Sequence, residues 1–127
     1  MSIVPFVEKT VLVKRYDMRL ETLMIVVLFR SRLGPAAGSD YSEMAVEMLE
    51  RAKTMAGFVE FKSFRNDDGE RVSLVYWQDE ETMKAWREDS RHRVAQRLGR
   101  EKWYDEYRIE VAEIRRSRTF TRPAAQS

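Results

Sequence analysis

The sequence contains no cysteine and only one histidine among its 127 residues, and these shortages remove several kinds of site. Without cysteine the chain has no disulfide framework, no thiolate metal site and no cysteine nucleophile. A structural zinc site is also disfavoured, because a single histidine would leave only carboxylates as further ligands. The lack of cysteine agrees with a reducing, cytoplasmic location, and we expect no structural metal site.

Long apolar runs and a dominant charge are missing too. The longest apolar run, residues 23–29, has the length of a strand, whereas a membrane span needs about 20 residues. The N-terminus lacks the basic and apolar regions of a secretory signal. Lysine and arginine number 23 and aspartate and glutamate 21, with both signs mixed along the chain. We therefore expect a solvated surface that binds neither nucleic acid nor membrane.

Apolar runs and alternating apolar residues predict the strands of the protein. The four predicted strands are residues 24–33, 58–65, 70–77 and 107–116. Alternation in the first strand puts Phe29, Ser31 and Leu33 on one face. Residues 66–69, Asn-Asp-Asp-Gly, have the composition of a hairpin turn between the second and third strands.

Helical spacing fills the gaps between these strands. Apolar residues at three- and four-residue steps, several of them methionines that we interpret as core filler, predict a helix from about residue 39 to 56. A second helix follows the third strand, and a further one runs to residue 98. The residues suited to the helix ends are Ser39 or Asp40, Asp79 and Ser90 at the starts, and Gly57 and Gly99 at the finishes.

The order strand, helix, strand, strand, helix, strand predicts an α+β ferredoxin-like βαββαβ plait, a four-stranded antiparallel sheet with its helices on one face. The other face also carries apolar residues and must be covered, most simply by a second copy of the chain, so we expect a homodimer. The domain would span residues 24–116. Residues 1–23 would be an extension, either disordered or packed as an arm on the partner, and residues 117–127 a polar tail.

The segment 76–107 holds all three tryptophans and the only histidine. Its landmarks are the pair Tyr76-Trp77 that ends the third strand, Trp86 on the next helix, and residues 92–96 (His-Arg-Val-Ala-Gln) and 99–104 (Gly-Arg-Glu-Lys-Trp-Tyr). In this order they resemble the antibiotic biosynthesis monooxygenase superfamily, over about residues 24–116. The resemblance implies a dimeric ferredoxin-like α+β barrel. It also implies either cofactor-free oxygenation of quinols and anthrones or haem degradation, the activities of characterised members.

The haem-degrading pattern can be compared position by position. It places an asparagine on the first strand, a tryptophan on the second helix and an iron-binding histidine about ten residues later. Trp86 matches, but the asparagine position falls near Phe29 and the histidine position near Gln96. His92 follows Trp86 by only six residues, so a continuous helix would aim it elsewhere. We therefore disfavour haem degradation.

Cofactor-free oxygenation requires a base titrating near neutrality, a cation that holds an oxyanion, and aromatic walls. His92 is the side chain suited to the first task. Arg100, with Arg30 as second choice, would hold the anion. The predicted substrate-binding residues are Phe29, Trp86, Gln96, Trp103, Tyr104 and Tyr107. The substrates would be a small phenolic, quinol or anthrone-like compound and O2.

Each of these residues also has a structural interpretation. His92 would then be an exposed or capping residue, and Trp86 a core residue. Trp103 and Tyr104 would pack against the last strand or in the dimer interface, and Arg100 would form an ion pair on the surface. The corresponding function is a non-catalytic dimer that binds a small aromatic compound or assists a biosynthetic enzyme. RNA binding is a further alternative, since residues 57–61 (Gly-Phe-Val-Glu-Phe) resemble an RNA-binding motif, although on the second strand instead of the third.

Overall fold

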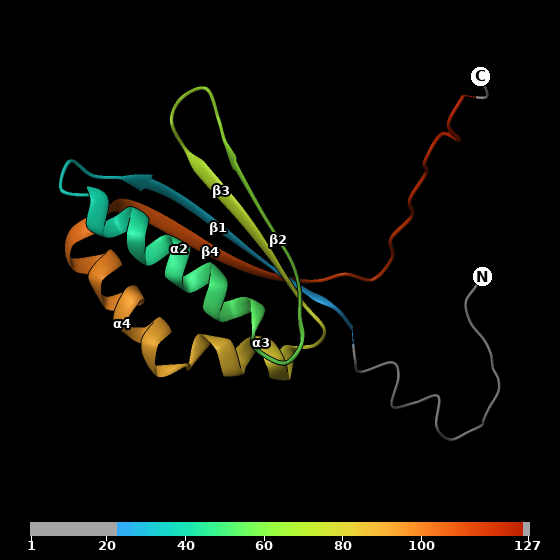
Figure 1. The fold of residues 1–127 in the computed structure, drawn as a ribbon, viewed down its shortest axis with the longest axis horizontal. Coiled ribbons are helices and arrows are strands. Elements are labelled where there is room, and N and C mark those ends of the chain that lie inside the picture. Colours follow the sequence, from blue (N-terminus) through green and yellow to red (C-terminus); the bar gives the residue numbers. More distant parts are fainter. Residues whose placement is uncertain (1–22, 126–127) are drawn as a thin grey trace.

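The computed structural model describes residues 23–125, and the predicted extension, residues 1–23, lies outside the described residues except for Leu23. Figure 1 shows the elements in chain order. They are β1 (Ile25–Leu33), α2 (Ser39–Lys53), β2 (Phe58–Arg65), β3 (Arg71–Trp77), α3 (Glu80–Arg87), α4 (Ser90–Leu98), the π-helical turn η1 (Gly99–Trp103) and β4 (Tyr104–Glu113). The predicted order of elements is confirmed. Among these described helices none is long and apolar enough to cross a membrane.

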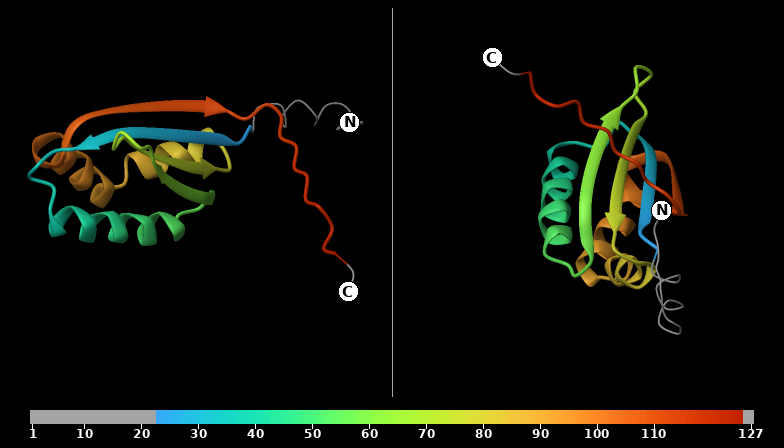
Figure 2. Two further views of the ribbon diagram at one scale, coloured as in Figure 1. Left: turned by 90° about the horizontal axis from the view of Figure 1, so that it is seen from above. Right: turned by 90° about the vertical axis from the view of Figure 1, so that its right-hand side faces the viewer.

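The strands form one antiparallel sheet in the order β2-β3-β1-β4. This is the arrangement expected for the ferredoxin-like plait. The helices lie together on one face of the sheet (Figure 2). Val27 of β1 pairs with Val75 of β3 and Val111 of β4, so side chains of these three residues share the helix-covered face.

The hydrophobic core lies between that face and the helices, toward one end of the sheet. Its buried residues are Ile25, Ala52, Trp77, Met83 and Trp86. Met48 and Met55 of α2 pack against it, as expected for core methionines. The indole of Trp77 is fully buried, and its ring centroid lies 6.2 Å from that of Trp86. Trp86 is thus part of the core and of the candidate site described below.

The opposite face of the sheet is not covered by any described element. Val26 and Leu28 of β1 lie on it beside Tyr76 and Leu74 of β3, which are their register partners. Toward the other end the face becomes charged, with Arg30 paired to Glu70 at 2.8 Å. The predicted apolar character of this face is therefore confirmed for its central part.

Several predicted boundaries were wrong. Neither Ser39 nor Asp40 caps α2, because Gly38 holds the cap position and no side chain caps it. Asp40 instead accepts hydrogen bonds from Lys102 at 2.6 Å and from the Trp103 indole at 3.1 Å. The contact with Lys102 is an ion pair, and the other carboxylate oxygen accepts a hydrogen bond from the Tyr41 backbone N–H at 2.8 Å.

The predicted end of α4 is confirmed, because the helix runs to Leu98 and Gly99 is its C-terminal cap. Gly99 has right-handed backbone angles, and the chain continues as the π-helical turn η1. A Cβ at Gly99 would lie 2.7 Å from the ring of Tyr104, so only glycine lets this turn approach that ring. As a consequence β4 begins at Tyr104 and not at Tyr107. Gly57, by contrast, has the predicted left-handed conformation, with a φ of +87°.

Candidate active site

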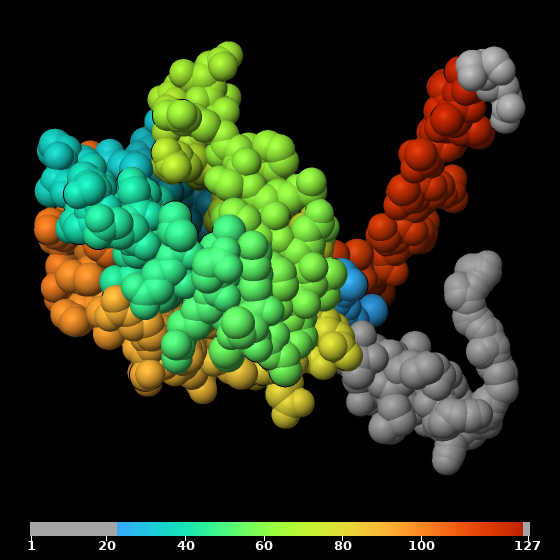
Figure 3. Space-filling model, in the orientation of Figure 1, coloured from blue at the N-terminus to red at the C-terminus, as the bar shows by residue number. Residues whose placement is uncertain are grey.

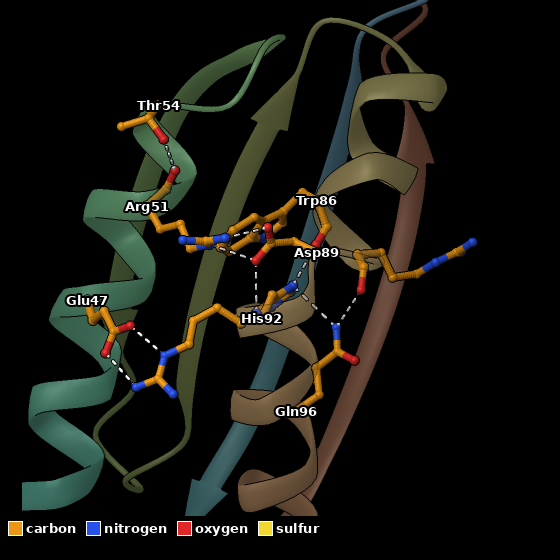
Figure 4. A network of polar contacts seen from close by, with 9 residues as sticks. Glu47, Arg51, Thr54, Trp86, Asp89, His92 and Gln96 are labelled. Carbon is orange, nitrogen blue, oxygen red and sulfur yellow. Dashed lines mark hydrogen bonds and ion pairs between the residues drawn. The ribbon is translucent and has the colours of Figure 1, made fainter.

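The start of α4 positions His92. Asp89 caps this helix, and its carboxylate accepts a hydrogen bond from the His92 backbone N–H at 3.0 Å. Arg51 of α2 donates two hydrogen bonds to the same carboxylate, at 2.7 and 3.0 Å (Figure 4). These bonds, the one from Arg51 first, lower the pKa of Asp89 to about 2. The cap is therefore an ion pair between α2 and the turn before α4.

The His92 ring stacks on Trp86. The two ring centroids are 4.1 Å apart and the planes differ by 12°. The Nδ1 atom of His92 lies 3.0 Å from the Trp86 carbonyl oxygen (Figure 4). Since a carbonyl oxygen only accepts hydrogen bonds, we assign the proton of the neutral ring to Nδ1. The Nε2 atom is then the unprotonated nitrogen and is able to act as a base.

The surroundings of His92 favour this neutral form. Burial lowers the pKa of the imidazole below its usual value, and the Trp86 carbonyl and the Asp89 charge oppose the shift to a smaller extent. Gln96, one turn further along α4, lies with its amide nitrogen 3.2 Å from Nδ1 and donates to the Arg87 carbonyl oxygen at 3.0 Å. Trp86, His92 and Gln96 thus form one connected group, which we call the histidine group.

A second group of predicted residues gathers at the far end of α4. Phe29 lies with its ring centroid 5.2 Å from Tyr104 and 5.4 Å from Tyr107. Tyr41 of α2 joins them, at 5.9 Å from Tyr104 and 5.6 Å from Trp103. We call these five residues the tyrosine group. All of these contacts except that of Phe29 with Tyr107 are edge-to-face, a geometry that holds aromatic rings in defined orientations.

The structure therefore divides the predicted site between two groups. Both lie along α4, since His92 is near its start and Gly99, which contacts Tyr104, follows its end. Seven residues separate these positions, or about 10 Å of helix. Arg100 belongs to neither group, because its side chain is exposed and has no ion pair with any residue of the described range. Arg30 lies on the open face of the sheet, where Glu70 binds it.

Two residues of the site were missed by the sequence analysis. Tyr41 was assigned only to the apolar stripe of α2, although a tyrosine at a helix start can turn its ring and hydroxyl toward the sheet. Arg71 begins β3, and its guanidinium carbon lies 6.0 Å from the centre of the Tyr41 ring. The signal was present in the alternation of β3, because Arg71 falls on the same face as Val75 and Trp77.

A shallow depression of about 210 Å³ lies where β1 and β4 run side by side. It is lined by Arg30, Ser31, Glu70, Glu106, Tyr107 and Arg108. The ion pair between Arg30 and Glu70 occupies part of this polar depression. It contains neither His92 nor any residue of the histidine group, so we do not assign the active site to it.

Comparison with known proteins identifies the family. The sequence pattern of the antibiotic biosynthesis monooxygenase family matches residues 24–98. The chain belongs to this family. The matched segment runs from β1 to the end of α4 and includes the whole histidine group, which lies between residues 86 and 96.

Relatives and solved structures agree with this family. The uncharacterized protein YqjZ of Bacillus subtilis is 34% identical over 80 residues, which are 63% of this chain and 70% of that protein. Jasmonate monooxygenase ABM of Pyricularia oryzae is 29% identical over 94 residues, 72% of this chain but only 43% of that protein. The crystal structure of SnoaB, a cofactor-independent oxygenase from Streptomyces nogalater, superposes with a TM-score of 0.63 at 12% identity, over 75% of this chain and 96% of that one. At 12% identity, the last comparison shows a shared fold alone.

Proposed function

We propose that the protein oxidises a small phenolic, quinol or anthrone-like compound with O2, and that His92 is the base. The observation that carries this proposal is the stacked, half-buried imidazole of His92, whose Nδ1 is held by the Trp86 carbonyl at 3.0 Å. A histidine held through one ring nitrogen presents the other with a defined direction and protonation state. Membership of a family with characterised monooxygenases supports the same reaction class.

The reaction needs no reductant besides the substrate. Nε2 of His92 takes a proton from a substrate hydroxyl or acidic CH group, and the resulting anion passes an electron to O2. Superoxide and the substrate radical then combine at carbon, and the peroxide loses water as a carbonyl forms. For an anthrone the balance is anthrone plus O2 giving anthraquinone plus H2O. The substrate supplies all the electrons that reduce the second oxygen atom to water.

The other predicted residues supply binding. The partly exposed rings of the tyrosine group, Phe29, Tyr41, Tyr104 and Tyr107, offer apolar surface for a fused-ring compound. Because such rings exclude water from the site, the attraction between a substrate oxyanion and a nearby cation becomes stronger. Arg100 remains the predicted cation from the sequence. Because it is exposed, a mutation such as Arg100→Gln tests its role directly, and loss of turnover without loss of folding would support it.

We also propose that two copies of the chain associate through the open face of the sheet. Val26, Leu28, Leu74 and Tyr76 form an apolar centre on that face, and a polar rim surrounds such centres in stable interfaces. The ion pairs of Arg30 with Glu70 and of Arg32 with Asp68, at 2.8 and 2.9 Å, lie at one side of it. Light scattering during size-exclusion chromatography should give twice the mass of the chain.

Oxygen consumption tests the proposed activity. Purified protein, treated with chelator and dialysed, is supplied with a panel of hydroquinones and anthrones in an oxygen electrode, with an anaerobic sample as control. We expect at least one compound to consume O2 faster with protein than without it. Binding of these compounds without any added oxygen consumption would contradict the proposal and would favour a binding or accessory role.

A further inference from the structure

Arg71 differs from the other arginines of the described range. Within residues 23–125 it is the arginine that is partly buried and yet has no carboxylate oxygen within 4 Å. Arg30, Arg32 and Arg91 are also partly buried, and each forms an ion pair with a carboxylate at 2.6 to 2.9 Å. A guanidinium that is removed from water normally has such a partner. Among the described residues, Arg71 therefore lacks the carboxylate partner that Arg30, Arg32 and Arg91 have.

The position of Arg71 directs it toward the tyrosine group. It pairs in register with Ser31 of β1, whose side chain is only 4% exposed. Alternation along β3 puts Arg71 on the helix-covered face, and the 6.0 Å approach of its guanidinium to the Tyr41 ring agrees. Figure 3 shows a hollow between α2 and the hairpin of β2 and β3, with atoms of β1 at its bottom.

The contact with Tyr41 does not satisfy Arg71. At 6.0 Å the guanidinium is at the outer limit of a cation–π interaction. Such a contact also uses the face of the guanidinium and leaves its five N–H donors available. These donors point outward in the plane of the group, in a pattern that matches the two oxygens of a carboxylate.

The tyrosines add hydroxyl donors and apolar walls next to this cation. Burial, followed by the nearness of Tyr41, raises the pKa of the Tyr104 phenol above its usual value, and the charge of Arg71 opposes this shift. The Tyr104 hydroxyl therefore stays protonated and can donate a hydrogen bond. The ring of Phe29, 5.2 Å from Tyr104, provides apolar surface at the same place.

We propose that Arg71, assisted by the hydroxyls of Tyr41 and Tyr104, binds a carboxylate of the substrate, so that the natural substrate is an apolar ring compound bearing an acid group. This proposal rests on the proposed function, because only that function makes the bound acid a substrate. The apolar ring of the substrate would lie against Phe29 and Tyr107, near the end of α4, whereas His92 lies near its start. Arg71 then selects the substrate, while the base at the other end of α4 acts on it.

The experiment compares an acid with its neutral isostere. Isothermal titration calorimetry at 0.15 M salt measures the affinities of 1-naphthoate and 1-naphthamide for the full-length protein. A hydrogen bond to a charged group contributes enough binding free energy that we expect the affinity for naphthoate to exceed that for the amide by about tenfold or more. Arg71→Gln should abolish this preference, and Arg71→Lys, which keeps the charge but not the planar fork, should retain part of it.

The matched control is Arg65→Gln. Arg65 is the register partner of Arg71 on β2, but it is exposed, so its substitution should leave the preference for naphthoate unchanged. Tyr104→Phe keeps the ring and removes the hydroxyl, and it should weaken naphthoate binding about two- to tenfold. This variant also serves as the test if Arg71→Gln does not fold, as judged by circular dichroism.

The result separates this proposal from the proposed function. Calorimetry needs no turnover, so an Arg71-dependent preference for naphthoate together with no oxygen consumption would support the acid site and refute the oxygenase. The opposite result is also possible to recognise. If neutral hydroquinones consume oxygen equally fast with the unmodified protein and with Arg71→Gln, and naphthoate and naphthamide bind equally, the oxygenase would be supported and the acid site refuted. Equal affinities in the unmodified protein, or a preference that survives in Arg71→Gln, would overturn the acid site.

Discussion

Replacing His92 with asparagine separates the chemistry of the imidazole from its packing. The side-chain nitrogen of asparagine can take the place of Nδ1 and keep the hydrogen bond to the Trp86 carbonyl, which is 3.0 Å long in the structure. The substitution removes Nε2, the proposed base. It also removes the ring that stacks at 4.1 Å on Trp86, so a stability loss of about 0.5–1.5 kcal/mol is expected.

Loss of a general base lowers turnover by about 10²- to 10⁴-fold. We expect His92→Asn to reduce kcat by at least about a hundredfold with any compound that the unmodified protein oxidises, and to leave its Kd nearly unchanged. The pH profile gives a second readout. The pKa of His92 is lowered by burial, so the active neutral form persists at and above neutral pH and is lost as the pH falls through that lowered pKa. The acid limb should vanish in His92→Asn.

Oxygen consumption measures kcat, and urea unfolding measures stability. His92→Phe is the complementary variant, because it keeps an aromatic ring on Trp86 but leaves the Trp86 carbonyl without its donor. Both variants should lose turnover, and only the phenylalanine variant should keep the stacking contribution. Turnover in His92→Asn above about one tenth of the original value would refute the role of His92 as base.

Three further predictions concern the fold and assembly. Asp89→Ala should destabilise the protein by about 1 kcal/mol at pH 7 through loss of the helix cap, and Asp89→Asn by less, because asparagine also caps helices. Since the pKa of Asp89 is lowered to about 2, its stabilising contribution is full above pH 3.8 and is lost as the pH falls toward 2, which acid titration of both variants will reveal. Gly57→Ala should lower the melting temperature more than Gly69→Ala, because both glycines have a positive φ but only a Cβ at Gly57 would meet Thr82. Leu74→Arg should convert the proposed dimer to a monomer in light scattering without unfolding it, and an unchanged mass would contradict the proposed interface.

The fold was predictable because the sequence patterns that define it are local. The faces assigned to β3 from alternation agree with the observed register, in which Leu74 pairs with Leu28 and Val75 with Val27. The hairpin turn ends at Gly69, whose φ of +95° explains the glycine there. The spacing of apolar residues, two in strands and three to four in helices, was sufficient to predict the order of every strand and of the main helices along the chain.

The failed boundaries depend on contacts between residues far apart in the sequence. Asp40 was expected to cap α2, but its partners Lys102 and Trp103 come from the other end of the domain. The π-helical turn at Gly99 follows from the close approach of Tyr104, which no local pattern indicates. Tertiary contacts of this kind override the intrinsic preference of a capping residue.

The histidine group was predicted as residue types but not as a geometry. A continuous helix would have pointed His92 and Trp86 in different directions, since six residues separate them. The chain instead breaks between α3 and α4, where Asp89 starts a new helix, and this break brings the two rings into contact. The sequence predicts a new helix that starts at Ser90, but the cap is Asp89, one residue earlier, and the contact between the two rings follows only from the fold.

The proposed function requires this chain to transfer one oxygen atom of O2 to its substrate. The most direct measurement is mass spectrometry of the product formed under ¹⁸O2 by chelator-treated protein supplied with an anthrone. We expect a product in which one oxygen atom is ¹⁸O, formed by the unmodified protein and at least about a hundredfold more slowly by His92→Asn. A product without the label, or labelled product formed equally fast by both proteins, would contradict it.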